Sequence, residues 1–196
     1  IVNTTTSAGG ADVEADDDYR ERIHEAPERF STAGPTGAYE YWAKTANSGI
    51  IDVAISSPSA GTVEIRPLLE GGKLPEQELL DTVKSIVSAD KVRPLTDNVT
   101  VLAPEAVAYD INLTYYVDAG TSEATVKAAV TSAIDTYRLW QKSKIGRDIN
   151  PSRLIADIMA VPGVKRVNVT SPTFKELTAT QVAQENSTIS AVLGGS

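Results

Sequence analysis

Residues able to carry out catalysis are few in this chain and widely spaced. His24 is the single histidine, and it lies in a charged stretch without a Ser or Cys at a spacing that suggests a partner. A nucleophile needs an adjacent base to become reactive, so the sequence favours an ordinary surface or packing role for His24. The chain contains no cysteine, which removes disulfides, thiolate metal sites and cysteine nucleophiles together.

Carboxylates are the remaining groups with potential chemistry. An acidic run comprises Asp12, Glu14, Asp16, Asp17 and Asp18. This run lacks the glycine and the terminal Glu of a calcium-binding loop, and its charges suit the start of a helix, where the dipole favours anions. Carboxylate pairs are conceivable at Asp148 with Asp157 and at Glu64 with Glu70, but the spacing singles out neither pair.

Motifs for nucleotide binding and acyl transfer are missing as well. Gly71-Gly72-Lys73 lacks the upstream glycine and the following Ser or Thr of a P-loop. Neither G-x-G-x-x-G nor a G-x-S-x-G nucleophile elbow occurs in the sequence. We therefore expect no catalytic residue, no cofactor-binding residue and no metal site, and hence a protein that is not an enzyme.

Composition restricts the class of partner. With 196 residues, 41% hydrophobic and 22% charged, the chain has the composition of a globular protein with a real core. The net charge of −8 argues against nucleic acid, because phosphate binding needs clustered Lys and Arg. No apolar run approaches the roughly 20 residues of a membrane span, so we expect no membrane insertion.

Aromatic residues indicate an interaction role near the start of the chain. Five of the eleven aromatic residues (two Trp, seven Tyr and two Phe in all) lie before residue 43, namely Tyr19, Phe30, Tyr39, Tyr41 and Trp42. Aromatic side chains need a surface to pack on. We interpret these five residues as interface candidates.

Hydrophobic periodicity predicts the elements that would position these residues. Residues 1–48 are expected to form an N-terminal helical arm, with short helices at 16–25 and 38–46 separated by a Gly/Pro break. Residues 49–106 are expected to form a first subdomain of order ββαβ. Residues 107–196 are expected to form a second subdomain of order βααβ with a polar C-terminal tail. The predicted class is α+β, with mostly antiparallel sheets.

The clearest strand is predicted at 107–117, where apolar and polar residues alternate. The long helix after it spans about 122–141, and Asn150-Pro151 is expected to cap a further helix. From Thr173 the tail is rich in Thr, Ser and Gln, and a short strand is predicted only at 188–193. Predicted core positions are Leu80, Val83, Ile111, Leu113, Ile134 and Ile158.

Several short motifs occur in a fixed order along the chain. They are Gly-Gly-Ala-Asp ending at Asp12, Tyr-Arg-x-Arg-Ile (19–23), Phe-Ser-Thr-Ala-Gly-Pro (30–35), Ala-Tyr-Glu-Tyr-Trp-Ala (38–43), Pro-x-x-Gly-x-Val (58–63), Val-Arg-Pro-Leu-Thr-Asp (92–97) and Val-x-Val-x-Ala-Pro (99–104). Together they resemble the baseplate J-like family of contractile-tailed phages and related injection machines. The resemblance is strong from Gly9 to about Val117, weaker to Pro172, and includes no catalytic signature.

The resemblance implies a wedge or baseplate assembly protein in a ring around the tail tube, contacting copies of itself and other wedge proteins. It further implies an oligomer located in the virion tail baseplate and assembled in the cytoplasm of the bacterial host. Because family members carry a further N-terminal region, Ile1 is expected to be the internal end of a longer chain. The alternatives are a cell-envelope hydrolase and a receptor- or ligand-binding module. Self-association would support assembly, whereas turnover of peptidoglycan would support the hydrolase.

Overall fold

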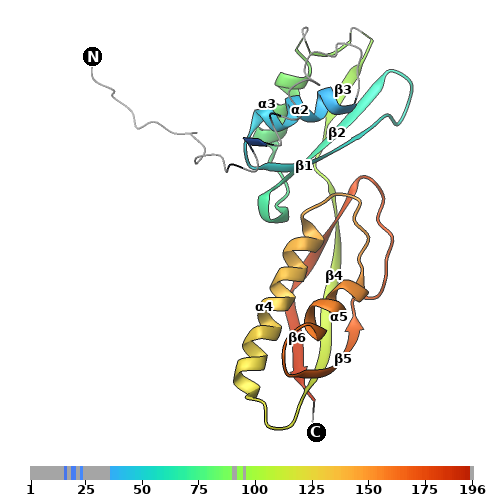
Figure 1. Ribbon diagram of the computed structural model, residues 1–196. Coiled ribbons are helices and arrows are strands. Elements are labelled where there is room, and N and C mark those ends of the chain that lie inside the picture. Colours follow the sequence, from blue (N-terminus) through green and yellow to red (C-terminus); the bar gives the residue numbers. More distant parts are fainter. Residues whose placement is uncertain are drawn as a thin grey trace, which may run out of the picture. The chain divides into compact units, whose positions relative to one another are not determined.

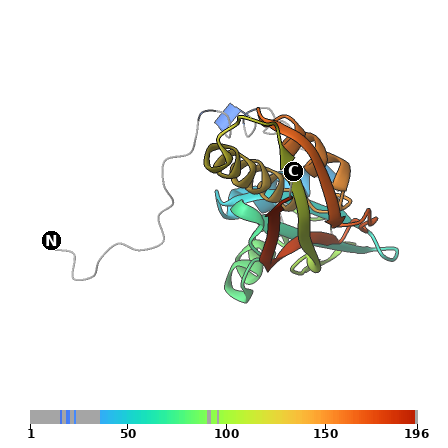
Figure 2. The ribbon, with the colours of Figure 1, turned by 90° about the horizontal axis from the view of Figure 1, so that it is seen from below.

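A computed structural model describes Asp16, Tyr19, Arg20, Ile23 and residues 36–89, 92–94 and 96–194. The chain divides into two compact units (Figures 1 and 2). Unit 1 comprises Ile1–Leu69 and Pro75–Ala103, and unit 2 comprises Glu70–Leu74 and Pro104–Ser196. Each unit has its own three-stranded sheet and its own helices, which confirms the α+β class.

Unit 1 is built from helices α2 and α3 and a sheet of order β1-β2-β3. Its elements are α2 (Thr36–Ala46), β1 (Ile50–Ser56), β2 (Thr62–Leu69), α3 (Gln77–Val87) and β3 (Asn98–Val101). Strands β1 and β2 form an antiparallel hairpin, whereas β2 and β3 are parallel. Both helices contribute to the core against the sheet, with Tyr39 and Ala43 from α2 and Leu80, Val83 and Val87 from α3.

Unit 2 contains a sheet of order β5-β4-β6 with two helices on one face. Its elements are η2 (Glu70–Gly72), β4 (Glu105–Val117), α4 (Glu123–Lys142), α5 (Pro151–Met159), β5 (Val164–Ser171) and β6 (Gln181–Leu193). In Figure 1, α4 runs beside β6, and α5 lies over the part of the sheet nearer β5. None of the described helices combines the length and apolar character needed to cross a membrane.

The sequence pattern explains the core of unit 2. In β4, Tyr109, Ile111, Leu113 and Tyr115 are buried on the face turned to the helices, and the residues between them are more exposed. This is the period of two expected of a strand with one wet face. At the start of α5, the Asn150 side chain accepts a hydrogen bond from the Ser152 amide at 3.0 Å, which confirms the predicted cap.

The six predicted core positions are all buried, with no more than 7% of their surface exposed. Two other features differ from expectation. Each sheet combines one antiparallel with one parallel pair, where the alternation predicted mostly antiparallel pairing. A sheet with one solvent-exposed face can also pair its strands in parallel when a helical crossover connects them. The connection from β2 to β3 contains such a helix, α3.

Strand β6 is the second difference, because it spans Gln181–Leu193 instead of a short stretch at 188–193. Its pairing with β4 is irregular: β4 advances from Tyr109 to Ile111 while β6 advances from Glu185 to Ile189. Extra residues in one strand break the period of two. The alternation that would have indicated a long strand is therefore interrupted in the middle of β6.

The segment 70–74, which belongs to unit 2, packs closely on α4. A Cβ atom at Gly72 would lie 2.6 Å from Lys142 Cγ, and its φ of +73° suits glycine. The Gln184 side-chain amide donates to the Gly72 carbonyl at 2.6 Å. These contacts fix η2 against α4 and the first half of β6.

Candidate interaction surfaces

Three of the four carboxylates considered for catalysis, Glu64, Asp148 and Asp157, accept hydrogen bonds from structural partners. Glu64 accepts from Arg66 at 2.7 Å, and Asp157 accepts from Arg153 at 2.9 and 3.0 Å. Asp148 accepts from the Leu177 amide at 2.8 Å. Glu70 lies in η2 at the surface. Asp148 thereby holds the loop that contains Leu177, whereas Asp157 links one turn of α5.

His24, Asp17 and most of the acidic run lie outside the described residues. Within the part of the chain that the structure describes, no group of three or more His, Cys, Asp or Glu residues could hold a metal ion.

The five aromatic interface candidates occupy different environments. Tyr19 is 49% exposed, and Phe30 lies outside the described residues. Tyr39 and Tyr41 are 2% and 8% exposed, and Trp42 is half-buried against the core of unit 1, with its ring edge-to-face with Tyr41 at 5.4 Å. The segment 36–46, expected to belong to a separate arm, packs instead on β1 and α3. Tyr39 is thus a core residue of its own chain, because its ring has almost no surface left for a neighbour.

Three of the sequence motifs meet in unit 1. The Tyr39 hydroxyl, from the 38–43 motif, donates to Asp97 Oδ2 at 2.8 Å. Arg93, in the same 92–97 motif as Asp97, donates to the carbonyls of Ser88 at 3.0 Å and Asp97 at 3.1 Å. Burial, and then the hydrogen bond to Asp97, raise the pKa of Tyr39, so its hydroxyl remains a donor.

The 58–63 turn joins the same cluster. Gly61 has a φ of +71°, its carbonyl accepts from the Asn98 amide at 2.7 Å, and a Cβ atom there would lie 3.3 Å from the Thr96 carbonyl oxygen. Motifs up to about 60 residues apart in sequence therefore fix one loop between helix α2 and the β1–β2 turn. These contacts hold unit 1 together.

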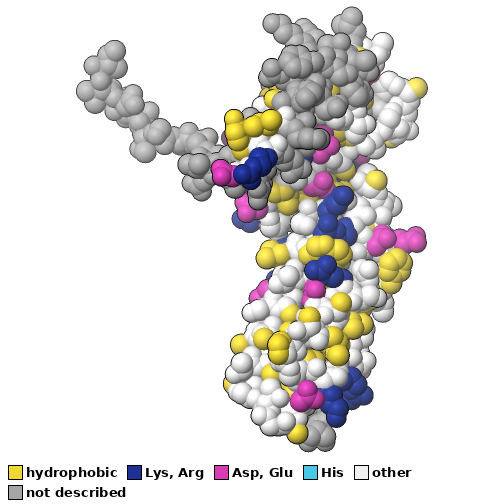
Figure 3. All heavy atoms as spheres, viewed as in Figure 1, with side chains coloured by type: hydrophobic (Ala, Val, Ile, Leu, Met, Phe, Trp, Pro, Cys, Tyr) yellow, Lys and Arg dark blue, Asp and Glu magenta, His cyan; other side chains and the backbone are white. Residues whose placement is uncertain are grey.

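The face of unit 2 that carries its helices is partly apolar (Figure 3). Leu139 on α4 is 57% exposed, and Ile155 and Met159 on α5 are 39% and 42% exposed. Ile155 and Met159 are four residues apart, so they share one flank of α5. Near them, Trp140 is covered by cations: the guanidinium carbons of Arg147 and Arg153 lie 4.3 and 5.2 Å from its ring centre. Arg147 and Arg153 are therefore engaged in contacts within unit 2.

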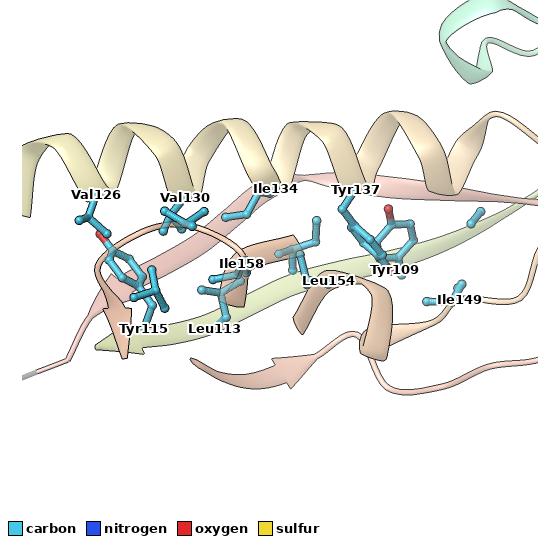
Figure 4. Close-up of a cluster of buried hydrophobic side chains, with 14 residues drawn as sticks. Tyr109, Leu113, Tyr115, Val126, Val130, Ile134, Tyr137, Ile149, Leu154 and Ile158 are labelled. Carbon is cyan, nitrogen blue, oxygen red and sulfur yellow. The ribbon is translucent and has the colours of Figure 1, made fainter. Parts of the chain in front are cut away.

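A second polar cluster lies between α4 and β6. Glu185 Oε1 accepts from Arg138 Nη2 and Lys142 Nζ, both at 2.8 Å. Burial alone would raise the pKa of Glu185, but the bonds from Lys142 and Arg138 outweigh it and lower that pKa. The nearby Tyr109 and Tyr137 rings, shown in Figure 4, meet edge-to-face at 6.4 Å. Burial is the main cause that raises the pKa of each of these two tyrosines.

A groove lies at the other end of α4, beside the second half of β6. It has a volume of about 590 Å³ and is lined by Tyr115, Glu123, Ala124, Lys127, Ala191, Val192 and Leu193. Val192 is 54% exposed. This surface could not be predicted from the expected elements, because most of β6 was expected to form a polar tail. The uncharged run from Asn186 to Leu193 was the signal that could have indicated it.

Comparison with known proteins gives consistent matches over most of the chain. Residues 31–103 match the Baseplate J-like central domain, and residues 109–190 match the Baseplate J-like protein C-terminal domain. The chain is 35% identical over 161 residues to Baseplate protein J of Escherichia phage P2, which covers 82% of this chain and 53% of that protein. The chain thus spans about half the length of this curated relative.

A solved structure shows the same fold. It is the cryo-EM structure of the anti-feeding prophage baseplate, six-fold symmetrised, with a TM-score of 0.58 and 16% identity. The similarity covers 86% of this chain and 41% of the matched chain.

Proposed function

Because this chain belongs to the baseplate J-like family, we propose that it is a non-enzymatic structural component of a contractile-tail baseplate. The observation that carries the proposal is the match of two successive family domains, in order, together with 35% identity to Baseplate protein J of Escherichia phage P2. The protein acts through protein–protein interfaces, with other wedge proteins and with copies of itself as partners. It is located in the virion tail baseplate and is assembled in the host cytoplasm.

The described residues support an interaction role in preference to hydrolysis. A glycoside hydrolase needs two carboxylates about 5–10 Å apart, one of them kept protonated by its surroundings. Here Glu64 and Asp157 pair with arginines, and Asp148 holds a backbone amide. Exposed apolar side chains on α4 and α5, by contrast, are suited to contacts with a partner protein.

The N-terminal segment 1–48 also takes part in assembly in this proposal. Tyr39, Tyr41 and Trp42 anchor α2 to unit 1, so they connect the residues before them to a folded body. Contacts with neighbours are then made by residues preceding α2, among which Tyr19 is exposed, with the acidic run facing a basic surface.

Deletion and complementation test this function. In a phage or prophage that encodes the full-length protein, deleting its gene should give particles without complete baseplates, and the full-length protein supplied in trans should restore them. Electron microscopy of the particles provides the readout. Complete baseplates in the deletion strain would contradict the proposal.

Peptidoglycan turnover tests the non-enzymatic part separately. The purified chain and its Asp157→Asn and Glu64→Gln variants should release no more fragments than buffer does. Release by the parent chain that either substitution abolishes would favour the hydrolase.

A further inference from the structure

The four edges of the two sheets differ in how far they are protected against pairing with another chain. Strand β3 has four residues, and the pairing of β1 is irregular between Ile50 and Asp52. Strand β5 carries exposed Lys165 and Arg166, and its pairing with β4 shifts twice. Short length, charge and bulges are the usual devices that prevent edge-to-edge association.

From Ile189 to Leu193, β6 has none of these devices, because the irregularity in its pairing lies before Ile189. Residues 186–193 read Asn-Ser-Thr-Ile-Ser-Ala-Val-Leu, without a charged residue or a proline. From Ile189 to Leu193 the pairing with β4 is regular. Within the described part of the chain, β4 is the single strand that pairs with β6. An uncharged, regular edge of this kind is a site for addition of a further strand.

Backbone direction identifies which residues would pair. The Gly194 amide donates to the Tyr115 carbonyl at 2.8 Å, so Gly194 turns towards β4. Backbone polar groups alternate in direction along a strand, so Val192 and Ser190 also turn towards β4. The N–H and C=O groups of Ile189, Ala191 and Leu193 therefore point away from it, along the free edge.

We propose that a second copy of this chain adds its own β6 antiparallel to this edge, across a two-fold axis at Ala191. This arrangement pairs Ala191 with Ala191 of the second copy and Ile189 with Leu193, all of which direct backbone groups outwards. Ser190 then lies opposite Val192, and no like charges face each other between residues 189 and 193. The inference rests on the proposed function, because it specifies one contact between copies in the baseplate.

Charge complementarity favours a second copy over an unrelated strand. Glu123 and Lys127 of α4 line the groove beside Ala191–Leu193 and lie four residues apart. We call the line along which the two β6 strands pair the seam. A two-fold axis at this seam sets the two α4 helices side by side and antiparallel. Glu123 of each copy then faces Lys127 of the other, and the small Ala124 between them permits close approach. In a two-fold interface each contact occurs twice, so the interface would contain two Glu123–Lys127 ion pairs.

Ala191→Pro tests the strand pairing. Proline removes an outward N–H and leaves the bonds to β4, which is the position where an edge strand tolerates it. In sedimentation equilibrium, the parent chain should dimerise, and Ala191→Pro should raise the dissociation constant at least tenfold with a nearly unchanged circular dichroism spectrum. Dimerisation of Ala191→Pro at the parent strength would overturn the inference, as would a parent chain that stays monomeric.

Charge reversal tests the geometry without touching the core. Glu123→Lys and Lys127→Glu should each weaken dimerisation several-fold at low salt, because each places like charges across the seam. The double reversal should restore the dissociation constant to within about threefold of the parent. Single reversals without effect, or a double reversal weaker than both, would exclude the antiparallel α4 arrangement even if Ala191→Pro failed to fold.

The outcomes separate this inference from the proposed function. A full-length Ala191→Pro protein that restores complete baseplates, although the purified chain has lost the dimer, would reject a role for this seam in assembly and leave the structural function standing. A chain that dimerises through β6 but whose gene is dispensable for baseplates would reject the function and leave the dimer. A monomeric chain that loses binding to another baseplate protein through Ala191→Pro would show a different occupant and overturn the second-copy proposal.

Discussion

Single side chains in unit 1 show how the 38–43 and 92–97 motifs contribute to the structure. Tyr39 was an interface candidate because aromatics need packing surface, and its ring is indeed packed, but within its own chain. Sequence alone cannot tell which surface covers an aromatic ring, because burial within a chain and burial between chains require the same side chain. The Tyr39 hydroxyl shows that the ring is covered within its own chain, because it donates a hydrogen bond to Asp97 in the loop before β3.

Tyr39→Phe should lower the free energy of unfolding of unit 1 by about 1.5–3 kcal/mol, the range for a hydrogen bond to a charged group. Urea unfolding of Tyr39→Phe, Asp97→Ala and the double variant measures this. The two substitutions should be less than additive, because each removes the same bond. Effects that add within about 0.3–0.5 kcal/mol would show that the hydroxyl and the carboxylate are not coupled.

Glu185 should make unit 2 sensitive to acid. Its pKa in the folded protein is lowered, because Lys142 and Arg138 stabilise the carboxylate more than burial disfavours it. The stabilisation is therefore fully present above the pKa of the unfolded chain, near 4.3, and is lost as the pH falls through the folded pKa. Glu185→Gln should destabilise unit 2 at pH 7, and the difference from the parent should shrink below about pH 4. A difference independent of pH would contradict this explanation.

Elements with regular periodicity could be predicted well from the sequence, and irregular ones could not. Strand β4 has an unbroken alternation and α5 has an Asn-Pro cap, and both lie where they were expected. Strand β6 was largely missed, because the extra residues between Glu185 and Ile189 break its alternation. The groove beside the second half of β6 could not be predicted either, because a sheet edge can be located only when its strand is known.

Helix α5 provides a matched test of which flank is buried. Leu154 is fully buried and Ile155 is 39% exposed, although they are adjacent and similar in size. Leu154→Ala should cost about 2–5 kcal/mol of unfolding free energy, because it leaves a cavity in the core. Ile155→Ala should cost less than about 1 kcal/mol, since surface substitutions usually have small effects. Equal losses of unfolding free energy in chemical denaturation would mean that α5 does not bury Leu154 in preference to Ile155.

At the scale of the whole molecule, the two hydrophobic cores have none of the described residues in common. The core of unit 1 gathers side chains from α2, α3 and its sheet, and that of unit 2 gathers side chains from α4, α5 and its own sheet. A body with its own core can unfold as a separate cooperative unit. The family comparison agrees with this division, because its two successive domains match on either side of residues 104–108.

We expect calorimetry of the chain to resolve two unfolding transitions. Ile65 in unit 1 is fully buried and Ile134 in unit 2 is 3% exposed, so replacing either by Ala should cost about 2–5 kcal/mol. Each kcal/mol lowers the melting temperature of a domain of 60–100 residues by about 4–8 °C. Ile65→Ala should therefore shift one transition by roughly 10 °C or more and leave the other in place, and Ile134→Ala should do the reverse. A single transition lowered by both substitutions would show that the two cores unfold together, in which case the cooperative unit is the whole chain.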